Sequence, residues 1–574
     1  MYVRVSQRAN KSGQVVRYLQ LAHNEWDAAA GVSRTKIIRS FGREDELDRA
    51  AIERLVASLT RLLGVEATAA AGAPEGMVFT DARPMGGAYV LDGLWTRLGI
   101  GAAIRAALGG KRSDPGRVER ILFGLVANRA LAPSSKLAAT DWIEHDVRVD
   151  GLSSVVDEAC YRAMDALLGV EARLCEEIYH QVADLLNLEV DLLFFDTTST
   201  YFETGGGQAD EPVARDEKGK VNPDPTATPT DNVRDVGFRT HGKSKDHRPD
   251  LPQVIIGMAV TRTGVPVRVW CWPGNTGDQA LIRQVKDEMR EWTLGRVVWV
   301  ADRGFSSAEN RRYLRAGGGH YIIGEKLRSG SADAEAALSR QGRYAVVAGN
   351  MRVKEVKLDD ADDRFIVCYN PDTAQRDRIV REQLVAQLEP TIAGSDELPA
   401  DKRAQLRGVI STKPGLNRFL RVTPGGLLRV DHAAIKAEQR LDGKYLLRSS
   451  DPKLSAEDIA LGYKQLLEVE RGWRDMKSVL DLRPVYHRLE DRIRAHVLLC
   501  WLALLLARVA ETSTGRTWPT IRAELQRLHA ITYTGTAGTA VQTTEPTKPQ
   551  RDLLTALTLD PPKRILELTP ATGA

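Results

Sequence analysis

The stretch DLLFFDTTSTYFE, residues 191–203, decides the fold class because it joins an apolar run to an acid. The apolar run is typical of a strand buried on both faces of a sheet, and it stops at Asp196 before a series of hydroxyl side chains. The segment GRVVWVADRGF, residues 295–305, has the same order, with Asp302 after the strand. In open α/β sheets, sites form beyond the carboxyl ends of the strands. If the two strands are parallel neighbours, both carboxylates meet at one edge.

The residues between these strands predict the rest of a mixed sheet. QVIIGMAVT and VPVRVWCW, residues 253–272, read as a hairpin with Gly264 in its turn. A helical pattern follows in DQALIRQVKDEMREW, and HYIIGEK, from residue 320, is a further short strand. Strand, hairpin, helix and strand in this order indicate an α/β domain.

Changes in pattern divide the chain into six segments, which predict a multidomain α/β protein. They are a basic, strand-rich unit with a helix (1–64), a helical module that could bind DNA (75–188), the first part of the sheet domain (189–325), a β-rich inserted domain (326–448), the second part of the sheet domain (449–515), and a C-terminal helix with a tail (516–574). The helix that starts at Asp114 and Pro115 has an acid and a proline in first-turn positions. Residues 204–250 are too long for an ordinary hairpin loop.

Composition places the chain among soluble globular proteins. Hydrophobic residues make up 43% and charged residues 27%, and 80 basic against 76 acidic residues leave a net charge of +4. Five cysteines without metal spacing indicate reduced thiols and a cytoplasmic location. The longest apolar run, residues 497–507, is too short to span a bilayer and predicts a buried helix, so no membrane partner is expected.

An acid at a strand end can simply begin a turn or cap the next helix. Two such acids in one sheet domain repel each other unless a cation lies between them, and Mg²⁺ is the natural cation for carboxylate oxygens. A helix that begins with a capping box of Ser455 and Asp458 offers a third ligand. Along it Glu470 lies in a stripe with Tyr463 and Lys477, although an amphipathic helix with Glu470 at its edge gives the same pattern.

The spacing of Tyr463, Glu470 and Lys477 resembles the Y-x₂-R-x₃-E-x₆-K signature of DDE transposases from bacterial insertion sequences, the cut-and-paste group with an RNase H-like core. The blocks FFDTTSTYFE, KSKDHRPDLPQVIIGM, WVADRGFSS and LLEVERGWRDMKSVLDLRPVYHR are similar to those of that family and stand in its order. The resemblance covers roughly residues 85–510. Leu466 departs from it, because it stands where the signature has arginine.

The resemblance implies that Asp196, Asp302 and Glu470 are catalytic residues and ligands of two Mg²⁺ ions, which Mn²⁺ can replace, and that no organic cofactor is needed. It also implies an endonuclease that binds double-stranded DNA, namely the terminal inverted repeats and the target, and acts as a dimer in the synaptic complex near the nucleoid. The inserted domain of hairpin-forming relatives stacks a tryptophan on a flipped base. Residues 326–448 contain no Trp, so either Phe419 or Tyr445 takes this role or the DNA end is processed differently.

DNA contacts are expected from basic and aromatic side chains around the acids. The candidates are Tyr463, Lys477, Arg474, Trp473, Lys243 and Arg303. Residues 1–43 carry eight basic residues against two acids, and residues 413–448 carry eight against three. Both segments are candidates for phosphate contacts, which give affinity without much sequence choice, although a solvated strand face gives the same composition.

Three other functions fit part of this pattern. A hydrolytic nuclease of the same fold shares the triad but lacks strand transfer. A DNA-binding relative without catalysis would not be expected to keep three acids. A glycosidase can use paired carboxylates, but the basic patches and strand-end acids do not suggest it.

Overall fold

The computed structural model describes residues 2–9, 15–27, 32–44, 47, 78–109, 114–185, 192–203, 207–216, 221, 234–290, 292, 297–328, 330–359, 361–536 and 538–570. The chain forms two compact units. The first comprises Met1–Thr80, Tyr533–Ala540 and Leu568–Ala574, and the second comprises Asp81–Thr532 and Val541–Glu567.

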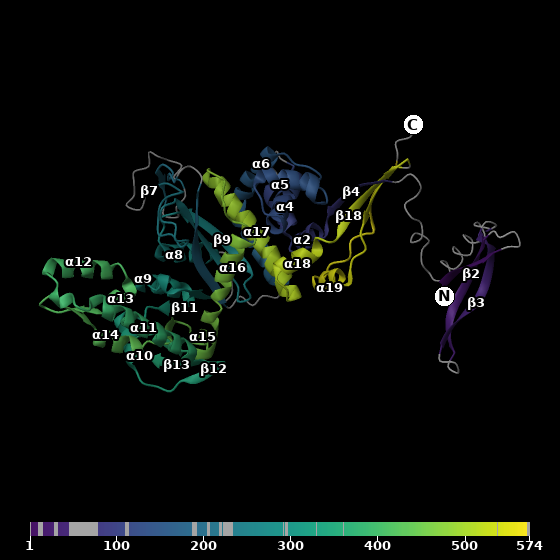
Figure 1. Cartoon of the computed structure of the whole chain (residues 1–574). Coiled ribbons are helices and arrows are strands. Elements are labelled where there is room, and N and C mark those ends of the chain that lie inside the picture. The colour runs from purple at the N-terminus through teal and green to yellow at the C-terminus, as the bar shows by residue number, and fades with distance from the viewer. Residues whose placement is uncertain are drawn as a thin grey trace. The chain divides into compact units, whose positions relative to one another are not determined.

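The first unit contains a three-stranded antiparallel sheet. Its strands are β1 (Tyr2–Ala9), β2 (Val15–Asp27) and β3 (Val32–Arg43), in the order β1-β2-β3 (Figure 1). They agree with the strands expected in the basic N-terminal segment. The helix predicted to end at residue 64 lies outside the described residues.

The second unit is built on one nine-stranded sheet. Its strands are β5 (Leu192–Tyr201), β8 (Gln253–Val260), β9 (Pro266–Pro273), β10 (Val298–Ala301), β11 (His320–Glu325), β12 (Ala345–Ala348), β13 (Met351–Lys357), β14 (Arg364–Tyr369) and β17 (Lys444–Ser449). The order is β12-β13-β14-β17-β11-β10-β5-β8-β9. β5, β10 and β11 run parallel to one another, and the other neighbours pair antiparallel. The predicted hairpin is β8–β9, with Gly264 at φ +77°.

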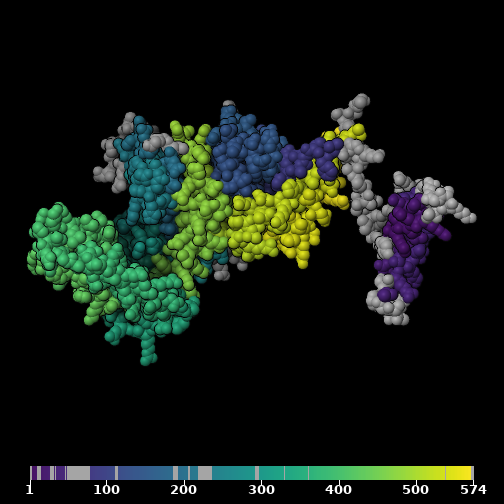
Figure 2. Space-filling view, viewed as in Figure 1, coloured from purple at the N-terminus to yellow at the C-terminus, as the bar shows by residue number. Residues whose placement is uncertain are grey.

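The segment predicted as a β-rich inserted domain differs from that prediction in two ways. Its strands β12, β13, β14 and β17 extend the main sheet, because β17 pairs with both β11 and β14. Its middle is mostly helical and forms the lobe seen in Figure 2, around a small core of its own. The lobe contains α11 (Pro371–Ile392), α12 (Ala400–Ser411), α13 (Pro414–Asn417) and α14 (His432–Gln439), with the short strands β15 (Leu420–Val422) and β16 (Leu428–Val430). The helix α10 (Ala332–Ser339) packs on β14.

The predicted helical module is present and packs around a long helix from later in the chain, α17 (Glu490–Thr514). Its members are α2 (Gly86–Arg97), α3 (Ile100–Leu108), α4 (Pro115–Leu131), α5 (Lys136–Asp141), the π-helix η2 (Trp142–Asp146), α6 (Asp157–Leu168) and α7 (Glu171–Leu185). The helix start expected at Asp114 and Pro115 is present, and the Asp114 side chain caps α4 by accepting from the amides of Gly116 and Arg117. The helix α17 packs on α4, α6 and β9.

α17 contains the longest apolar run and is a core helix, as predicted. By length and composition it could cross a membrane, but 94% of its most apolar window is buried inside the protein. The burial of this helix accounts for its apolar composition.

The C-terminal residues are more ordered than the expected tail. α18 (Trp518–Leu525) and α19 (Lys548–Ala556) accompany β18 (His529–Gly535), β19 (Gly538–Thr543) and β20 (Ile565–Pro570). The three strands share a sheet with β4 (Val78–Pro84), in the order β20-β19-β18-β4.

The helix expected from Ser455 onward is two helices. α15 (Ala456–Lys464) starts with the predicted Ser455–Asp458 capping box, and α16 (Leu467–Ser478) follows after a break at Gln465 and Leu466. The predicted stripe from Tyr463 to Lys477 therefore does not lie on one continuous helix.

The remaining described elements surround the sheet. They are the paired strands β6 (Val213–Arg215) and β7 (Arg234–Val236), the helices α8 (Asp278–Arg290) and α9 (Ala308–Arg315), and the 3₁₀ turns η3 (Arg303–Phe305), η4 (Ala316–Gly318) and η5 (Ser395–Glu397).

Candidate active site

Asp196 and Asp302 lie at the same level on two neighbouring strands. β5 and β10 are parallel, and Phe195 pairs with Ala301, so the next residue of each strand is an aspartate. The condition under which the sequence places the two carboxylates together, that these strands are parallel neighbours, is met. The arrangement brings two carboxylates to the carboxyl end of β10.

The sequence prediction that β5 ends at Asp196 is wrong. β5 continues to Tyr201 because residues 197–201 pair with Gly257 back to Gln253 of the antiparallel β8. Asp196 therefore lies in the middle of β5, at the point where β10 ends. The hydroxyls of Thr197 and Thr198 belong to a buried strand and not to a turn.

Burial is the main influence on the charge of Asp196. Burial, together with the smaller effect of the nearby carboxylates of Asp278 and Asp302, raises the pKa of this carboxyl to about 6. The ammonium of Lys245 opposes this shift and favours the charged form. Such a site favours a cation beside Asp196.

Asp302 is oriented by a tyrosine from the helix above the sheet. The Tyr463 hydroxyl, on α15, donates to Asp302 Oδ1 at 3.0 Å. Burial, followed by the charge of Asp302, raises the pKa of Tyr463, so the phenol keeps the proton that it donates. Tyr463 is therefore a hydrogen-bond partner of a candidate metal ligand.

A second group beside Asp196 consists of Lys245, Thr197 and Asp278. The Thr197 hydroxyl donates to Asp278 Oδ1 at 2.6 Å, and Lys245 Nζ lies 3.3 Å from Asp278 Oδ2. Lys245 Nζ also donates to the carbonyl of Thr197 at 2.8 Å. The sequence reasoning missed Asp278, because an acid in the first turn of α8 looks like a helix-dipole residue. Only the fold shows that this turn lies beside β5.

Glu470 lies on the same side of the sheet as Asp196 but does not join it. α16 lies on β8, where a Cβ on Gly472 would approach Met258 Cε to 2.6 Å, and Met258 pairs with Asp196. Glu470 is exposed, and no described residue bonds to its carboxylate. Among the described residues, no three His, Cys, Asp or Glu side chains are close enough to hold a metal ion together. The structure thus brings two of the three predicted ligands together.

Lys477 points back to the sheet. Its ammonium donates to Thr198 Oγ1 and to Asp246 Oδ1, both at 2.8 Å. Burial lowers the pKa of Lys477, and the bond to Asp246 acts in the opposite direction. Lys477 therefore contacts β5 at Thr198, which is two residues after Asp196 and on the same face of the strand.

The other predicted DNA contacts differ in their exposure to solvent. Lys243, Arg303 and Arg474 are exposed. Trp473 is only 5% exposed and packs in the main hydrophobic core, so its ring is not presented to a ligand and we do not keep it as a DNA contact.

The two aromatic candidates for base stacking are also not free. Phe419 is buried in the core of the helical lobe. Tyr445 stacks on Tyr463, with ring centroids 6.1 Å apart, and its hydroxyl donates to Met351. Neither ring is available to stack on a base in this conformation.

Several basic residues of segment 413–448 are held by acids. Arg448 is buried against Asp363, and Arg429 pairs with Asp396. The exposed basic side chains of this segment without a recorded acidic partner are Lys413, Arg421, Lys436 and Arg440. The free positive charge of the segment is therefore smaller than the sequence suggests.

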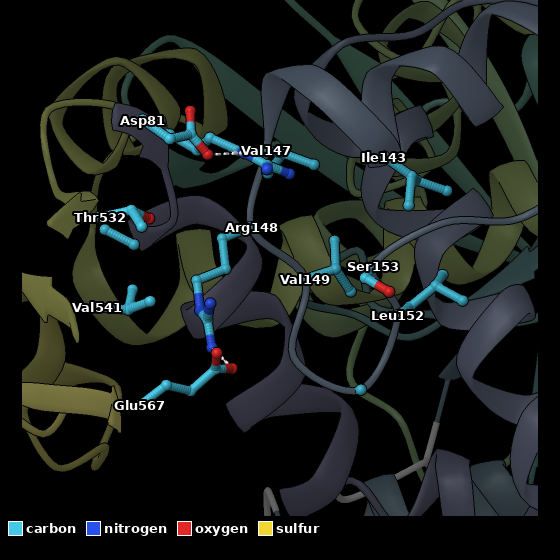
Figure 3. Close-up of a pocket in the computed structure, with 13 residues that line it drawn as sticks. Asp81, Ile143, Val147, Arg148, Val149, Leu152, Ser153, Thr532, Val541 and Glu567 are labelled. Atoms are coloured by element: carbon cyan, nitrogen blue, oxygen red, sulfur yellow. Dashed lines mark hydrogen bonds and ion pairs between the residues drawn. The ribbon is translucent and has the colours of Figure 1, made fainter. Parts of the chain in front are cut away.

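A cavity of about 360 Å³ lies apart from the acids, between the helical module and the C-terminal strands. Figure 3 shows that two of its charged side chains are paired across it, Arg148 with Glu567 at 2.6 Å. Arg83 pairs with Asp81 at 2.5 Å. Because the arginines that line it are neutralised, this cavity is not a candidate for the phosphate chemistry of the chain.

Comparison with known proteins gives two family matches. Residues 227–506 match the transposase DDE domain, and residues 3–69 match the N-terminal domain of IS1634 family transposases. The first match includes Asp302 and Glu470 and begins after Asp196. No curated protein matches the chain. The chain belongs to the DDE transposases of insertion sequences.

A solved structure is also similar at low identity. It is the cryo-EM structure of the piggyBac transposase synaptic complex with hairpin DNA, with 11% identity, a TM-score of 0.35 and coverage of 76% of each chain. At this TM-score the likeness supports no conclusion about the site.

Proposed function

We propose that this transposase binds the ends of its insertion sequence and catalyses Mg²⁺-dependent cleavage of the DNA and its transfer to a target. The observation that carries this proposal is the parallel pairing of β5 and β10, which puts Asp196 beside Asp302. The two family matches supply the transposase class.

The topology supports an RNase H-like core. Within the nine-stranded sheet the first five strands along the chain are β5, β8, β9, β10 and β11, and they take the spatial order β9-β8-β5-β10-β11. An antiparallel three-stranded meander is thus joined to two parallel strands. The candidate acids lie where the meander meets the parallel strands.

The residues present fit a divalent cation in part. Asp196 and Asp302 offer the hard oxygen ligands that Mg²⁺ prefers, and Mn²⁺ accepts the same donors. The raised pKa of Asp196, to about 6, reflects a buried carboxyl beside other acids that a cation would stabilise in its charged form. Glu470 would join these ligands only if its side chain or α16 moves. When bound, two such ions would activate water and stabilise the charge that develops on the phosphate oxygens.

The chain's own residues orient the acids and the DNA. Tyr463 fixes the rotation of Asp302 through its hydrogen bond. Lys245 donates to the carbonyl of Thr197 and pairs with Asp278, which holds both residues in place beside Asp196. Lys477 and the exposed Arg303 and Lys243 contact phosphates near the scissile bond. The 3′-hydroxyl of the cleaved end then attacks a phosphodiester of the target, which forms a new P–O bond and releases the 3′-oxygen of the target strand as a hydroxyl.

A different unit of the chain from the one that carries the acids recognises the DNA ends. The basic N-terminal sheet, which carries the IS1634-type match, contacts the terminal repeats, and two protomers pair two ends in a synaptic dimer. Neither step requires an organic cofactor.

The central experiment replaces one carboxylate at a time. We expect Asp196→Asn, Asp302→Asn and Glu470→Gln each to reduce Mg²⁺-dependent cleavage of an end duplex by at least a thousandfold, while DNA binding stays within about threefold. The control is Asp359→Asn, whose side chain is 93% exposed. Normal cleavage by any of the three variants would remove that residue from the site, and cleavage in EDTA would remove the metal.

The same assay separates a transposase from a nuclease. Pre-cleaved ends are incubated with a supercoiled target plasmid, and joined products are separated on a gel. Cleavage without joining, under conditions where the ends are bound, would favour a nuclease.

A further inference from the structure

The loop before β8 places one acid between two cations of the helical layer. Asp246 Oδ1 accepts from Lys477 Nζ at 2.8 Å and lies 3.2 Å from Arg483 Nη1. Lys477 belongs to α16 and Arg483 to the segment after it, so the contact joins parts of the chain more than 200 residues apart. The Asp246 side chain is only 10% exposed.

This contact is held from several sides. The backbone amides of Asp246 and Arg248 both donate to the Ser244 hydroxyl, and the amide of Lys245 donates to Ser199 Oγ on β5. The guanidinium of Arg483 lies 5.0 Å from the ring centroid of Tyr201, at the end of β5. Asp246 and its two cations are thus fixed relative to the strand that carries Asp196.

The backbone is strained on both sides of the contact. Among the described residues, only three non-glycine residues have a positive φ. Two of them are His247, at +58°, which follows Asp246, and Asp481, at +44°, which lies two residues before Arg483. Strain of this kind persists where the surrounding structure fixes it, and it gathers at functional sites.

The hydrogen bonds and ion pairs around Asp246 leave one N–H donor of Lys477 and one carboxylate oxygen of Asp246 without a partner among the described residues. Lys477 has three N–H donors and uses two, on Thr198 and Asp246. Asp246 Oδ2 is buried, and no described residue bonds to it. A buried carboxylate oxygen without a partner is costly, so a purely structural ion pair would be expected to satisfy it.

We propose that Asp246 is a positioning residue, which holds Lys477 and Arg483 side by side as a two-cation clamp for one phosphate of the DNA strand that enters beside Asp196. This rests on the proposed function. Without Asp246 the two cations repel each other and separate. With it, their free donors point in a fixed arrangement and one net positive charge remains for the phosphate.

The sign of the effect makes the proposal testable. Removing a negative charge from a DNA-binding surface strengthens binding by simple attraction. A positioning role predicts the reverse: Asp246→Asn weakens binding although it makes the surface more positive. An acid that merely occupied the phosphate position would give tighter binding.

The experiment measures binding of the full-length protein to a fluorescein-labelled duplex carrying the DNA that flanks its gene, at several salt concentrations. We expect Asp246→Asn to weaken binding roughly tenfold, as for the loss of one charge-assisted contact, and to reduce the log–log salt slope by about one. The matched control is Asp250→Asn, an exposed acid of the same loop that pairs with Arg248. Binding by Asp246→Asn that equals or exceeds wild type would overturn the proposal.

A double-mutant cycle tests whether Asp246 acts through Lys477. We expect Lys477→Ala to weaken binding, and Asp246→Asn to add little to it, because the clamp is already lost. Fully additive losses would overturn the proposal. In cleavage kinetics, Asp246→Asn should raise KM for the end duplex more than it lowers kcat.

Two further comparisons keep the result interpretable. If Asp246→Asn does not fold, Asp246→Glu is compared with Asp250→Glu. The longer side chain displaces Lys477 and should weaken binding about threefold at position 246 only, and equal binding of the two would count against the clamp. If the wild-type protein neither binds nor cleaves the end duplex, the proposed function fails. If it does both, but Asp246→Asn and Asp250→Asn behave alike, the positioning role of Asp246 is refuted and the proposed function stands.

Discussion

At the scale of single residues, Leu466 explains how the chain departs from the transposase signature. Its side chain is 9% exposed and packs in the main core, at the break between α15 and α16. The position that carries arginine in the signature is thus filled by packing in this chain. The sequence identified the departure, but its consequence depended on whether position 466 faces solvent or core, which the break in the helix determines.

An arginine at this position should therefore destabilise the protein. We expect Leu466→Arg to lower the free energy of unfolding by about 3 kcal/mol, because it buries a guanidinium without a partner. The matched control is Leu467→Arg, whose side chain is 55% exposed and should change stability by less than about 0.5 kcal/mol. Denaturant unfolding measures both. Unchanged stability of Leu466→Arg together with tighter DNA binding would show that the signature arginine can still reach DNA here.

The hydrogen bond from Tyr463 to Asp302 gives a second prediction at this scale. Tyr463→Phe removes the donor that orients Asp302 and keeps the ring that stacks on Tyr445. Partners of metal ligands typically contribute 10- to 100-fold in metal affinity, so the Mg²⁺ concentration for half-maximal cleavage should rise about tenfold or more. Tyr445→Phe is the control, because its hydroxyl donates to Met351 and not to an acid of the site. An unchanged Mg²⁺ dependence would mean that the bond does not orient the acid.

At the scale of elements, features that depend on neighbouring residues were predicted correctly, whereas most features that depend on distant segments were missed. The Asp114 cap, the Ser455–Asp458 capping box and the turn at Gly264 follow from neighbouring residues, and all three are present. The extension of β5 beyond Asp196 depends on β8, and the position of Asp278 depends on how α8 packs. No periodicity within either segment contains this information. For the same reason the sequence could not show that the strands of residues 345–449 extend the main sheet.

The placement of α16 on the sheet depends on a glycine. A Cβ on Gly472 would lie 2.6 Å from Met258 Cε, the flexible end of a side chain, so Gly472→Ala should be tolerated. Gly472→Val adds methyl groups that a small movement of the Met258 side chain cannot accommodate, and it should destabilise the fold by about 1–3 kcal/mol. Met258→Ala in the same chain should recover part of that loss. Thermal unfolding of the four proteins tests this. A Gly472→Val variant as stable as wild type would show that α16 is not seated here.

At the scale of the whole molecule, we assign DNA-end recognition to the N-terminal sheet and the chemical step to the nine-stranded sheet. The nine-stranded sheet carries the acids and the cations around them, whereas the N-terminal sheet carries the match to the IS1634 N-terminal domain. Arg4 and Arg8 lie on one face of β1, since side chains alternate along a strand, and both are exposed. If this face contacts the terminal repeats, its charge should affect binding and leave the chemistry unchanged.

We therefore expect Arg4→Ala with Arg8→Ala to weaken binding of the end duplex and to reduce the log–log salt slope by about two, one for each phosphate contact. The cleavage rate at saturating DNA should stay within about twofold, because the acids are untouched. The matched control is Arg162→Ala with Arg527→Ala, which removes two exposed arginines that pair with local acids in the other unit. Equal slopes for the two double variants would place end recognition elsewhere, and a slower reaction at saturating DNA would mean that the N-terminal face also takes part in the chemical step.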